Sequence, residues 1–469
     1  MTEQVCWDPL LIQRYNRPGP RYTSYPTAVE FQPVSAQTEQ RDAIERQAFA
    51  ARDPSRPLSL YLHIPFCRHV CYYCGCNKIV TKNTSKAAPY LQLLKQEIRA
   101  KYDLLSQHGT QPVAEVEQLH LGGGTPTFLS DEELEELVNY LKNLFTFSRA
   151  KNADFSIEID PRELRTGTLV LLRKLGFNRI SYGVQDLVHK VQAAVNRIQP
   201  REMIESVMAE ARALGFRSIN IDLIYGLPHQ TLASFDETLD AIIAMRPDRL
   251  SVFNYAHLPE RFKPQRRING DDLPSAQEKL AILGHSIQKL TDAGYHYVGM
   301  DHFALPDDEL AVAQAAGQLH RNFQGYTTHA QCDLIGFGVS SISQIGDYYL
   351  QNQVVMNEYE SAVAAGYLPT MKHLQASADD KVIRYVITEL LCHLHVDFDV
   401  IDQRFGIDSR QFLADGLSRL QPMVEDQLVD ISAQGVRIRD KGRLLVRNAC
   451  MAFDEYLHQH EQQRFSKAI

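Results

Sequence analysis

Six short apolar segments alternate with longer amphipathic segments between residues 58 and 253. Each short segment is apolar or β-branched at most of its positions, which is typical of a strand buried on both faces of a parallel sheet. The predicted strands are residues 58–64, 116–121, 155–159, 179–184, 218–224 and 249–253.

The segments between these strands have the period of helices. The clearest begins at Ser130, where Glu133 completes a capping-box pattern and apolar positions then recur at helical spacing up to Phe145. A second helix is predicted between Pro200 and Gly215. Strands that alternate with helices predict an α/β protein with a parallel sheet covered by helices. A doubly wound sheet and a barrel both fit this order, and we favour a partial (β/α)6 barrel.

The chemically unusual residues lie at the ends of the predicted strands. A cysteine-rich loop follows the first strand, and the glycine run 122–125 follows the second. Glu158, Gln185 and Asp222 lie near the ends of the third, fourth and fifth strands. The active site of a (β/α) barrel lies where its strands end. This agreement favours the barrel and predicts one site at that edge of the sheet.

The regions that flank the predicted barrel have other patterns. Residues 1–55 show little helical or strand period, and segment 15–26 holds three prolines and a glycine, so we expect an arm without regular structure. The arm either packs on the surface or covers the substrate. Residues 56–370 are assigned to the barrel domain, with a helix near 276–293 and a loop-rich stretch at 300–350.

Residues 371–469 are predicted to form a mainly helical C-terminal domain. Strands 428–431 and 436–438 flank Gly435 as a hairpin, and an apolar helix follows, which resembles a winged helix. Winged helices often bind nucleic acid. However, acidic residues are mixed with the arginines of this hairpin, and the formal net charge of the chain is −8. We therefore expect no nucleic-acid partner.

The composition is that of an ordinary globular protein, with 44% hydrophobic and 23% charged residues among 469. No stretch approaches 18 uninterrupted apolar residues, and the first residues lack a basic segment followed by an apolar one. We therefore expect no membrane partner and a cytoplasmic location, and we expect a monomer.

Four of the eight cysteines lie within ten residues, and Cys67, Cys71 and Cys74 have the spacing C-x3-C-x2-C. In a reducing compartment such a group is more typical of a metal site than of disulfides. Three thiolates from one loop can hold a 4Fe–4S cluster and leave one iron open. The alternative is a structural zinc site, which we favour less because the chain has no second C-x2-C pair elsewhere. Its fourth ligand would be one of Cys76, His63 and His69.

The cysteine loop resembles that of the radical S-adenosylmethionine (SAM) superfamily, in which it follows the first barrel strand. Tyr73 before the third cysteine and the run 122–126, Gly-Gly-Gly-Thr-Pro, are similar to that superfamily as well. Glycines allow backbone groups to approach the amino-acid part of the cofactor closely. The resemblance implies a partial radical SAM barrel with a bound 4Fe–4S cluster.

A closer resemblance covers essentially the whole chain. Residues 22–26, 74–78, 183–186, 220–228 and 322–327 are similar to the family of oxygen-independent coproporphyrinogen III dehydrogenases of haem synthesis. This resemblance implies oxidative decarboxylation of two propionates of coproporphyrinogen III to vinyl groups, giving protoporphyrinogen IX by 5′-deoxyadenosyl radical chemistry. It also implies an electron donor and an electron acceptor, which the sequence does not identify.

The same resemblance implies roles for individual residues. Cys67, Cys71 and Cys74 would bind the cluster, while Cys76 would be an active-site thiol and Tyr61 would belong to the catalytic centre. Two SAM molecules are expected. The positions that match the first SAM site are Tyr61, Gly123, Glu158 and Ile342. Those that match the second are Tyr73, Gly124, Thr125, Gln185, Arg197, Asp222 and Ala256.

Three other functions stay open beside this one. A haem chaperone of the same superfamily typically lacks a cysteine at the position of Cys76 and the segment 22–26, and both are present here. The other two are a radical enzyme with a different substrate and a nucleic-acid-binding regulator.

The four propionates of the implied substrate require cationic or amide donors. The candidate cations are Arg17, Arg21, Lys78, Arg261, Arg266 and Arg267.

Overall fold

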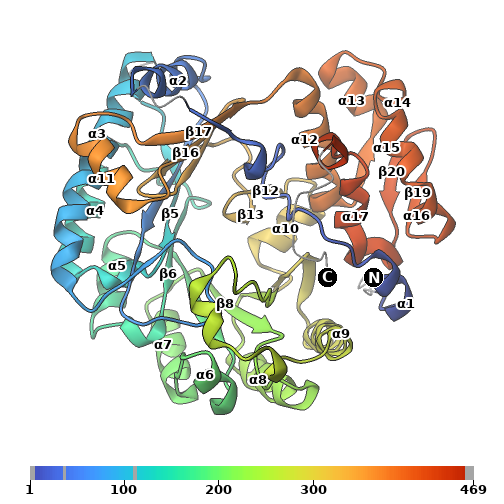
Figure 1. Ribbon diagram of the computed structural model, residues 1–469, viewed down its shortest axis with the longest axis horizontal. Helices are drawn as coiled ribbons and strands as arrows, with labels where there is room; N and C mark the ends of the chain where they lie inside the picture. Colours follow the sequence, from blue (N-terminus) through green and yellow to red (C-terminus); the bar gives the residue numbers. More distant parts are fainter. Residues whose placement is uncertain (1–5, 35–37, 109–112, 460–469) are drawn as a thin grey trace.

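The structure is a computed structural model that describes residues 6–34, 38–108 and 113–459. A curved sheet with helices along its outer side lies beside a second, mainly helical unit formed by the C-terminal part of the chain (Figure 1). No helix within the described ranges is long and apolar enough to cross a membrane.

Six parallel strands form the centre of the sheet and follow one another in chain order. Each strand is hydrogen-bonded to the next, with no switch in the order, so the doubly wound alternative does not apply. The predicted partial (β/α)6 barrel is confirmed. Its strands are β2 (Leu58–Ile64), β5 (Val116–Gly123), β6 (Asp154–Ile159), β7 (Arg179–Gln185), β8 (Ser218–Tyr225) and β9 (Arg249–Asn254).

Helices connect these strands on the outer side of the sheet (Figure 1). The predicted helix at 130–145 is α4, where Ser130 and Glu133 form both hydrogen bonds of the capping box. The helix predicted after Pro200 is present as α7. The connecting helices are α3 (Ala87–His108), α4 (Asp131–Leu144), α5 (Thr168–Lys174), α6 (His189–Ala194), α7 (Arg201–Ala213) and α8 (Leu232–Met245).

The sheet extends beyond the six strands at both edges. On one side β14 (Asp333–Phe337) pairs with β2 in parallel, and antiparallel strands continue from it. These are β15 (Ile342–Ile345), β16 (Tyr348–Asn352), β17 (Thr370–Gln375) and β1 (Gln32–Pro33). On the other side β9 is followed by β11 (His302–Ala304) and β10 (His296–Gly299), which come after helix α9 (Ala276–Asp292).

The prediction of a loop-rich stretch at 300–350 is wrong. This stretch contains strands β11 and β14–β16, helix α10 (Glu309–Ala315) and the separate hairpin of β12 (His320–Asn322) and β13 (Gly325–Thr327). The strands there have only three to five residues. Segments this short are too brief to show a period of two along the sequence.

The N-terminal arm is more regular than expected, since it contains helices α1 (Pro9–Tyr15) and α2 (Thr38–Ala50). Segment 16–26 has no helix, as the prolines predict, but it is firmly packed. Tyr22 and Tyr25 are buried in the core of the C-terminal unit, and the Tyr22 hydroxyl donates to Asp454 at 2.9 Å. The arm therefore lies between the barrel and the C-terminal unit.

The C-terminal unit begins with the capping box of α12 (Ala378–His393). The predicted hairpin is confirmed as β19 (Val429–Ile431) and β20 (Gly435–Ile438), and β18 (His395–Asp397) pairs with β20 as a third strand. The remaining helices are α13 (Phe398–Phe405), α14 (Ser409–Phe412), α15 (Ala414–Arg419), α16 (Gln421–Glu425), α17 (Val446–Met451) and α18 (Glu455–Gln459).

Candidate active site

A cavity of about 300 Å³ lies at the carboxyl ends of the parallel strands, beside the cysteine loop. It brings together most of the predicted site residues, including all four cysteines of the loop. The predicted residues that line it are Cys67, Cys71, Cys74, Cys76, Tyr73, Gly123, Gly124, Thr125, Glu158, Gln185, Arg197 and Asp222.

The three cysteines of the C-x3-C-x2-C loop each receive a hydrogen bond. Cys67 accepts from the Thr125 hydroxyl at 3.6 Å, and Cys74 accepts from the backbone N–H of Cys76 at 3.5 Å. Burial raises the pKa of Cys67 to about 12, whereas the hydrogen bond with Cys76 and the nearby Lys78 lower the pKa of Cys74. The sulfur atoms of Cys67 and Cys74 therefore line the same cavity but lie in different electrostatic environments.

Cys71 lies against a buried network of charges. Its sulfur accepts from Arg197 Nη1 at 3.4 Å and from Arg162 Nη2 at 3.5 Å. Asp160 pairs with both guanidinium groups, at 2.9 and 2.7 Å. Burial raises the pKa of Asp160, but Arg197 and Arg162 outweigh that effect and hold it at about 2. The network therefore places two cationic donors on the Cys71 sulfur.

The donor set fits a four-iron cluster better than a single metal ion. Within the described ranges, no three His, Cys, Asp or Glu side chains are grouped so that they could hold one ion. His63 and His69, two proposed fourth ligands for zinc, contact Asn77 O and Glu163 at 2.9 Å instead. A 4Fe–4S cluster takes one thiolate per iron, and three thiolates around one cavity suit it.

The glycine run is required by packing within the protein. A Cβ on Gly123, whose φ is +113°, would come within 2.7 Å of the His63 ring, and one on Gly124 would come within 2.7 Å of Phe66 O. The N–H groups of Gly124 and Thr125 donate to Ile64 O and Phe66 O, each at 2.8 Å. These contacts hold the cysteine loop against β5, so the run positions the loop directly.

Two carboxylates in the cavity have opposite shifts. Burial raises the pKa of Glu158, but hydrogen bonds from His120 and the Gly123 N–H lower it below the usual value overall. Burial and the charge of Glu158 raise the pKa of Asp222 to about 6, despite hydrogen bonds from Asn220 and Ser181. Glu158 is therefore the more stable anion of the two.

Three predicted residues do not line this cavity. The Tyr61 hydroxyl contacts His63 Nδ1 at 3.1 Å, and its ring stacks on His120, so Tyr61 lies next to the residue that contacts Glu158. The carbonyl of Ala256 accepts from Gln265, which also donates to Tyr73 O. Ile342 lies in β15 and packs near Phe31 and Tyr349.

Sequence reasoning missed the side chains that hold the loop in place. Glu163 pairs with Arg68 at 2.7 Å and with His69 at 2.9 Å, and Asp160 and Arg162 support Cys71 as described. The signal was available in the polar run directly after the third strand, Asp160-Pro161-Arg162-Glu163. Such a run at a barrel strand end is typical of an active-site wall.

Of the six cations proposed for the propionates, only Lys78 lines the cavity, and its amino group donates to Cys74 O at 3.0 Å. Arg21 pairs with Asp301 at 3.2 Å. The guanidinium groups of Arg261 and Arg267 lie over the rings of Phe262 and Tyr72. Arg266 donates to Pro259 O, and Arg17 lies in the arm segment after α1.

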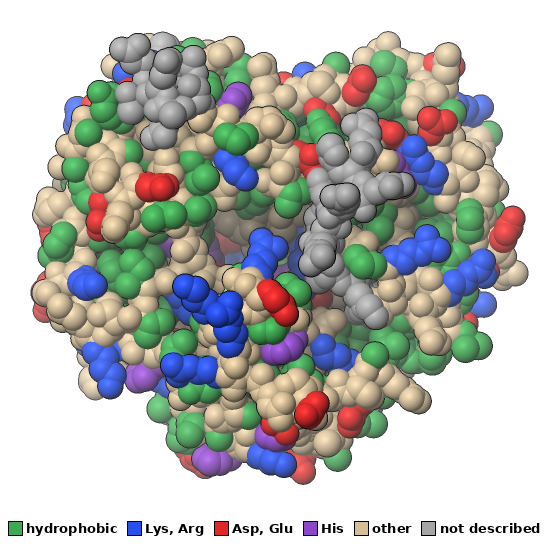
Figure 2. Space-filling view, viewed as in Figure 1, with side chains coloured by type: hydrophobic (Ala, Val, Ile, Leu, Met, Phe, Trp, Pro, Cys, Tyr) green, Lys and Arg blue, Asp and Glu red, His purple; other side chains and the backbone are tan. Residues whose placement is uncertain are grey.

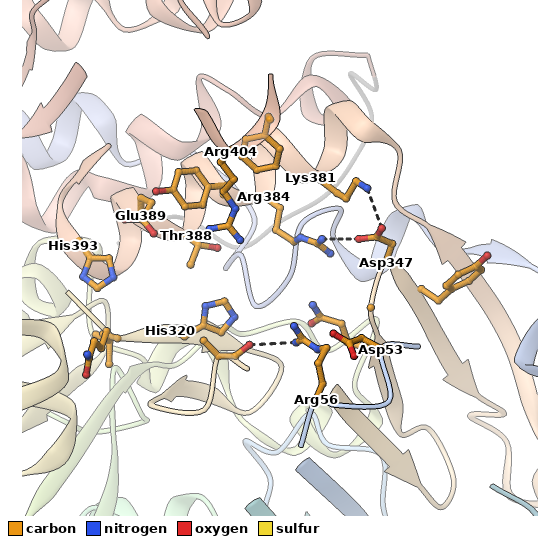
Figure 3. A pocket seen from close by; sticks show the side chains of 18 of the residues that line it. Asp53, Arg56, His320, Asp347, Lys381, Arg384, Thr388, Glu389, His393 and Arg404 are labelled. Carbon is orange, nitrogen blue, oxygen red and sulfur yellow. Dashed lines mark hydrogen bonds and ion pairs between the residues drawn. The ribbon is translucent and has the colours of Figure 1, made fainter. Parts of the chain in front are cut away.

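A larger pocket of about 660 Å³ lies between α12 and the other edge of the barrel (Figure 3). None of the predicted site residues lines it. Its cations are largely paired, since Lys381 and Arg384 both bind Asp347 at 3.1 Å and Arg56 binds Asp333 at 3.0 Å. The cavity at the cysteine loop is therefore the candidate active site.

Comparison with known proteins shows the family to which the chain belongs. The family model of the radical SAM superfamily matches residues 61–242, and that of the HemN C-terminal domain matches residues 376–445. The chain is 52% identical over 469 residues to the oxygen-independent coproporphyrinogen III oxidase of Pseudomonas aeruginosa, covering 100% of both proteins. It is 48% identical over 472 residues to that of Escherichia coli, again covering 100% of both.

The fold agrees as well. The solved structure of coproporphyrinogen III oxidase (HemN) from Escherichia coli, described as a radical SAM enzyme, matches with a TM-score of 0.90 and 48% identity. The match covers 97% of this chain and 100% of that one. Radical SAM enzymes use a 4Fe–4S cluster and SAM. The chain belongs to the family of oxygen-independent coproporphyrinogen III oxidases.

Proposed function

We propose that this protein converts two propionates of coproporphyrinogen III to vinyl groups and so forms protoporphyrinogen IX. The observation that carries the proposal is the cavity that joins the three-cysteine loop to polar residues from the neighbouring strands β6, β7 and β8. For each propionate, one hydrogen atom, one carbon dioxide molecule and one further electron leave, and an external acceptor has to take that electron.

Cys67, Cys71 and Cys74 are proposed to hold the 4Fe–4S cluster. The cluster and SAM, when bound, supply the 5′-deoxyadenosyl radical that takes the hydrogen atom from a propionate. Asp160 holds Arg162 and Arg197 against Cys71, and both guanidinium groups donate hydrogen bonds to its sulfur. Cys76 is exposed at the cavity two residues after Cys74, and we propose it as the active-site thiol.

We infer that two SAM molecules bind, as the family resemblance implies. Glu158, ionised through its lowered pKa, can accept from an ammonium or hydroxyl group. Within the described residues, Gln185 Oε1 and Arg197 Nε are buried without hydrogen-bond partners, so an acceptor and a cationic donor are free to bind polar ligand groups. Tyr61, Ala256 and Ile342 are not among the residues that line the cavity, and we propose that they contribute to SAM binding from beside it or through backbone atoms.

The proposal includes a monomeric, cytoplasmic enzyme with an electron donor and an electron acceptor that remain to be identified. The test is an anaerobic assay of the reconstituted protein with SAM, a reductant and coproporphyrinogen III. We expect both 5′-deoxyadenosine and protoporphyrinogen IX. 5′-Deoxyadenosine without porphyrin turnover would point to another substrate. Neither product, with haem bound instead, would favour the haem chaperone.

A further inference from the structure

The hairpin of β12 and β13 crosses the inside of the barrel below the active-site cavity. The Thr327 hydroxyl in β13 accepts from Gln118 of β5 at 3.3 Å. Gln118 lies two residues before His120, which contacts Glu158 in the cavity wall, so both side chains face the same side of the sheet. The hairpin therefore forms a floor one side-chain layer below the cavity.

The two faces of this hairpin differ. His320 lines the pocket in Figure 3, where it points toward Arg56 and Arg384. Successive residues of a strand point to opposite faces, so Arg321 lies on the other face. There its guanidinium stacks over the ring of Tyr326, its partner across the hairpin, at 4.8 Å.

Arg321 is a buried cation whose hydrogen-bonding capacity is not used. Arg321 is 8% exposed, and its Nε and Nη1 atoms have no hydrogen-bond partner among the described residues. None of the ion pairs in the described part of the chain includes it. Gln324 Nε2 in the same hairpin and His302 Nδ1 beside it are also buried without partners. Buried polar groups are nearly always paired, so this cluster of unused groups indicates a ligand.

Arg321 is a cation with no carboxylate partner among the described residues, so the ligand group it fits is an anion. The nearby Arg21 and Arg249 are paired with Asp301 and Asp308, so the carboxylates present there already have partners. His302 contacts the Tyr326 ring at 5.3 Å, and burial together with Arg321, Arg249 and Arg21 lowers its pKa to about 3. Burial and then Arg21 lower the pKa of Arg447 to about 10. On the face shown in Figure 2, Lys and Arg side chains gather beside a hollow at the centre of the molecule.

The same cluster is connected to the active site. Phe253 lines the cavity and contacts the His302 ring edge-to-face at 6.0 Å. The register of the sheet also aligns Asp222 with Ser251, and Ser251 with His302. Because neighbouring strands are about 4.8 Å apart, the backbones at Asp222 and His302 are separated by about 10 Å. A ligand held at Arg321 can therefore extend into the cavity.

We propose that Arg321 binds a propionate carboxylate of the porphyrinogen, one that does not react while another propionate occupies the cavity. This assignment rests on the proposed function, because it needs a substrate with several carboxylates. It makes Arg321 a residue for substrate recognition and orientation. A guanidinium presents a planar fork that matches a carboxylate, and the Tyr326 ring holds that plane in place.

The test is a fluorescence titration of the full-length protein with coproporphyrin III, the oxidised tetracarboxylate, and with its uncharged tetramethyl ester. For Arg321→Gln we expect coproporphyrin III to bind about tenfold to a hundredfold more weakly, as the loss of a hydrogen bond between charged groups predicts, and the ester to bind as before. Arg321→Lys should recover part of the affinity. Arg384→Gln, which removes a cation in the other pocket, is the matched control and should leave both affinities unchanged.

Equal binding of coproporphyrin III by wild type and Arg321→Gln would overturn the assignment. If Arg321→Gln melts well below the wild type, the titration of Arg321→Lys replaces it. In that case the assignment is contradicted if Arg321→Lys prefers coproporphyrin III over the ester as strongly as the wild type does. The titration needs neither cluster nor reductant. A wild-type protein that binds coproporphyrin III through Arg321 but does not turn over coproporphyrinogen III would refute the proposed function and leave this assignment standing.

Discussion

The buried cations at one end of the barrel interior have carboxylate partners, whereas Arg321 at the other end has none among the described residues. At the cysteine loop, Arg162 and Arg197 share Asp160, and Arg68 pairs with Glu163, so the cations that support the loop have partners within the protein. At the floor, Arg321 is about as buried as Arg197, yet none of the ion pairs among the described residues includes it. Paired charges hold the proposed cluster ligands in place before anything binds, whereas the unpaired Arg321 is free for the proposed interaction with a substrate carboxylate.

The most severe test removes Cys67, a proposed ligand of the cluster. We expect Cys67→Ser to lower 5′-deoxyadenosine formation by more than about a hundredfold, since even the partners behind metal ligands can cost that much. Iron content and 5′-deoxyadenosine would be measured together. Cys392→Ser is the control, because Cys392 is buried in the C-terminal unit and should leave both unchanged. Full iron loading of Cys67→Ser would contradict the ligand assignment.

The next test breaks the pairing itself. Asp160→Asn leaves two buried guanidinium groups without their shared anion, so we expect a loss of about 3–5 kcal/mol in unfolding free energy and about tenfold lower activity. Denaturant melts of the cluster-free protein give the first value.

The effect of Asp160 should depend on pH. Its pKa in the folded protein, about 2, is below the ordinary value of 3.8, so the carboxylate stabilises the fold above pH 4. That contribution disappears as the pH falls toward 2. The difference in stability between wild type and Asp160→Asn should therefore shrink over this window. A difference that stays constant between pH 6 and pH 2 would show that the charge of Asp160 does not matter.

Whereas Asp160→Asn should lower the free energy of unfolding, removal of the Arg321 charge at the floor should not. Arg321→Met keeps the length of the side chain and removes a buried charge without a carboxylate partner, so the ligand-free protein should keep its stability or gain about 1–3 kcal/mol. Thermal unfolding without porphyrin checks this. A clear loss of stability would mean that Arg321 has a structural partner, and the contrast between the two ends would fail.

The smallest loss of stability is expected for a variant of a residue that does not line the cavity, and it serves as a reference for the other variants. Ser130→Ala removes one hydrogen bond of the capping box of α4, outside the barrel interior, and should cost about 1 kcal/mol. Activity at a temperature well below the midpoint of unfolding should not change. Any loss of activity in this variant would measure how far a purely structural defect contributes to the other results.

The six central strands could be predicted because buried parallel strands are nearly continuous apolar runs. Most of the site could be predicted too, since barrel topology brings residues at the strand ends together. The pairing of Asp160 with Arg197 could not, because it depends on how the end of β6 packs against a segment 37 residues later. Arg321 was equally hidden, since nothing in its local sequence shows that its guanidinium is buried.

The contacts of Tyr61 could not be predicted either. It is not among the residues that line the cavity, but it lies on the same side of β2 as His63 and its ring stacks on His120, which contacts Glu158 in the cavity. Short strands such as β12 carry no readable period, so the hairpin that closes the floor was assigned to a loop.

The position of the N-terminal arm has a consequence for biosynthesis. Tyr22 binds Asp454, and Asn448 donates to Tyr15 O at 2.7 Å, so during synthesis the arm waits for partners that lie 432 and 433 residues later in the chain. At about 5–20 residues per second, this interval is at least some twenty seconds. The barrel strands can assemble during translation, but the arm docks only after Asn448 and Asp454 have been synthesised. The arm therefore stays undocked while the whole barrel is being made.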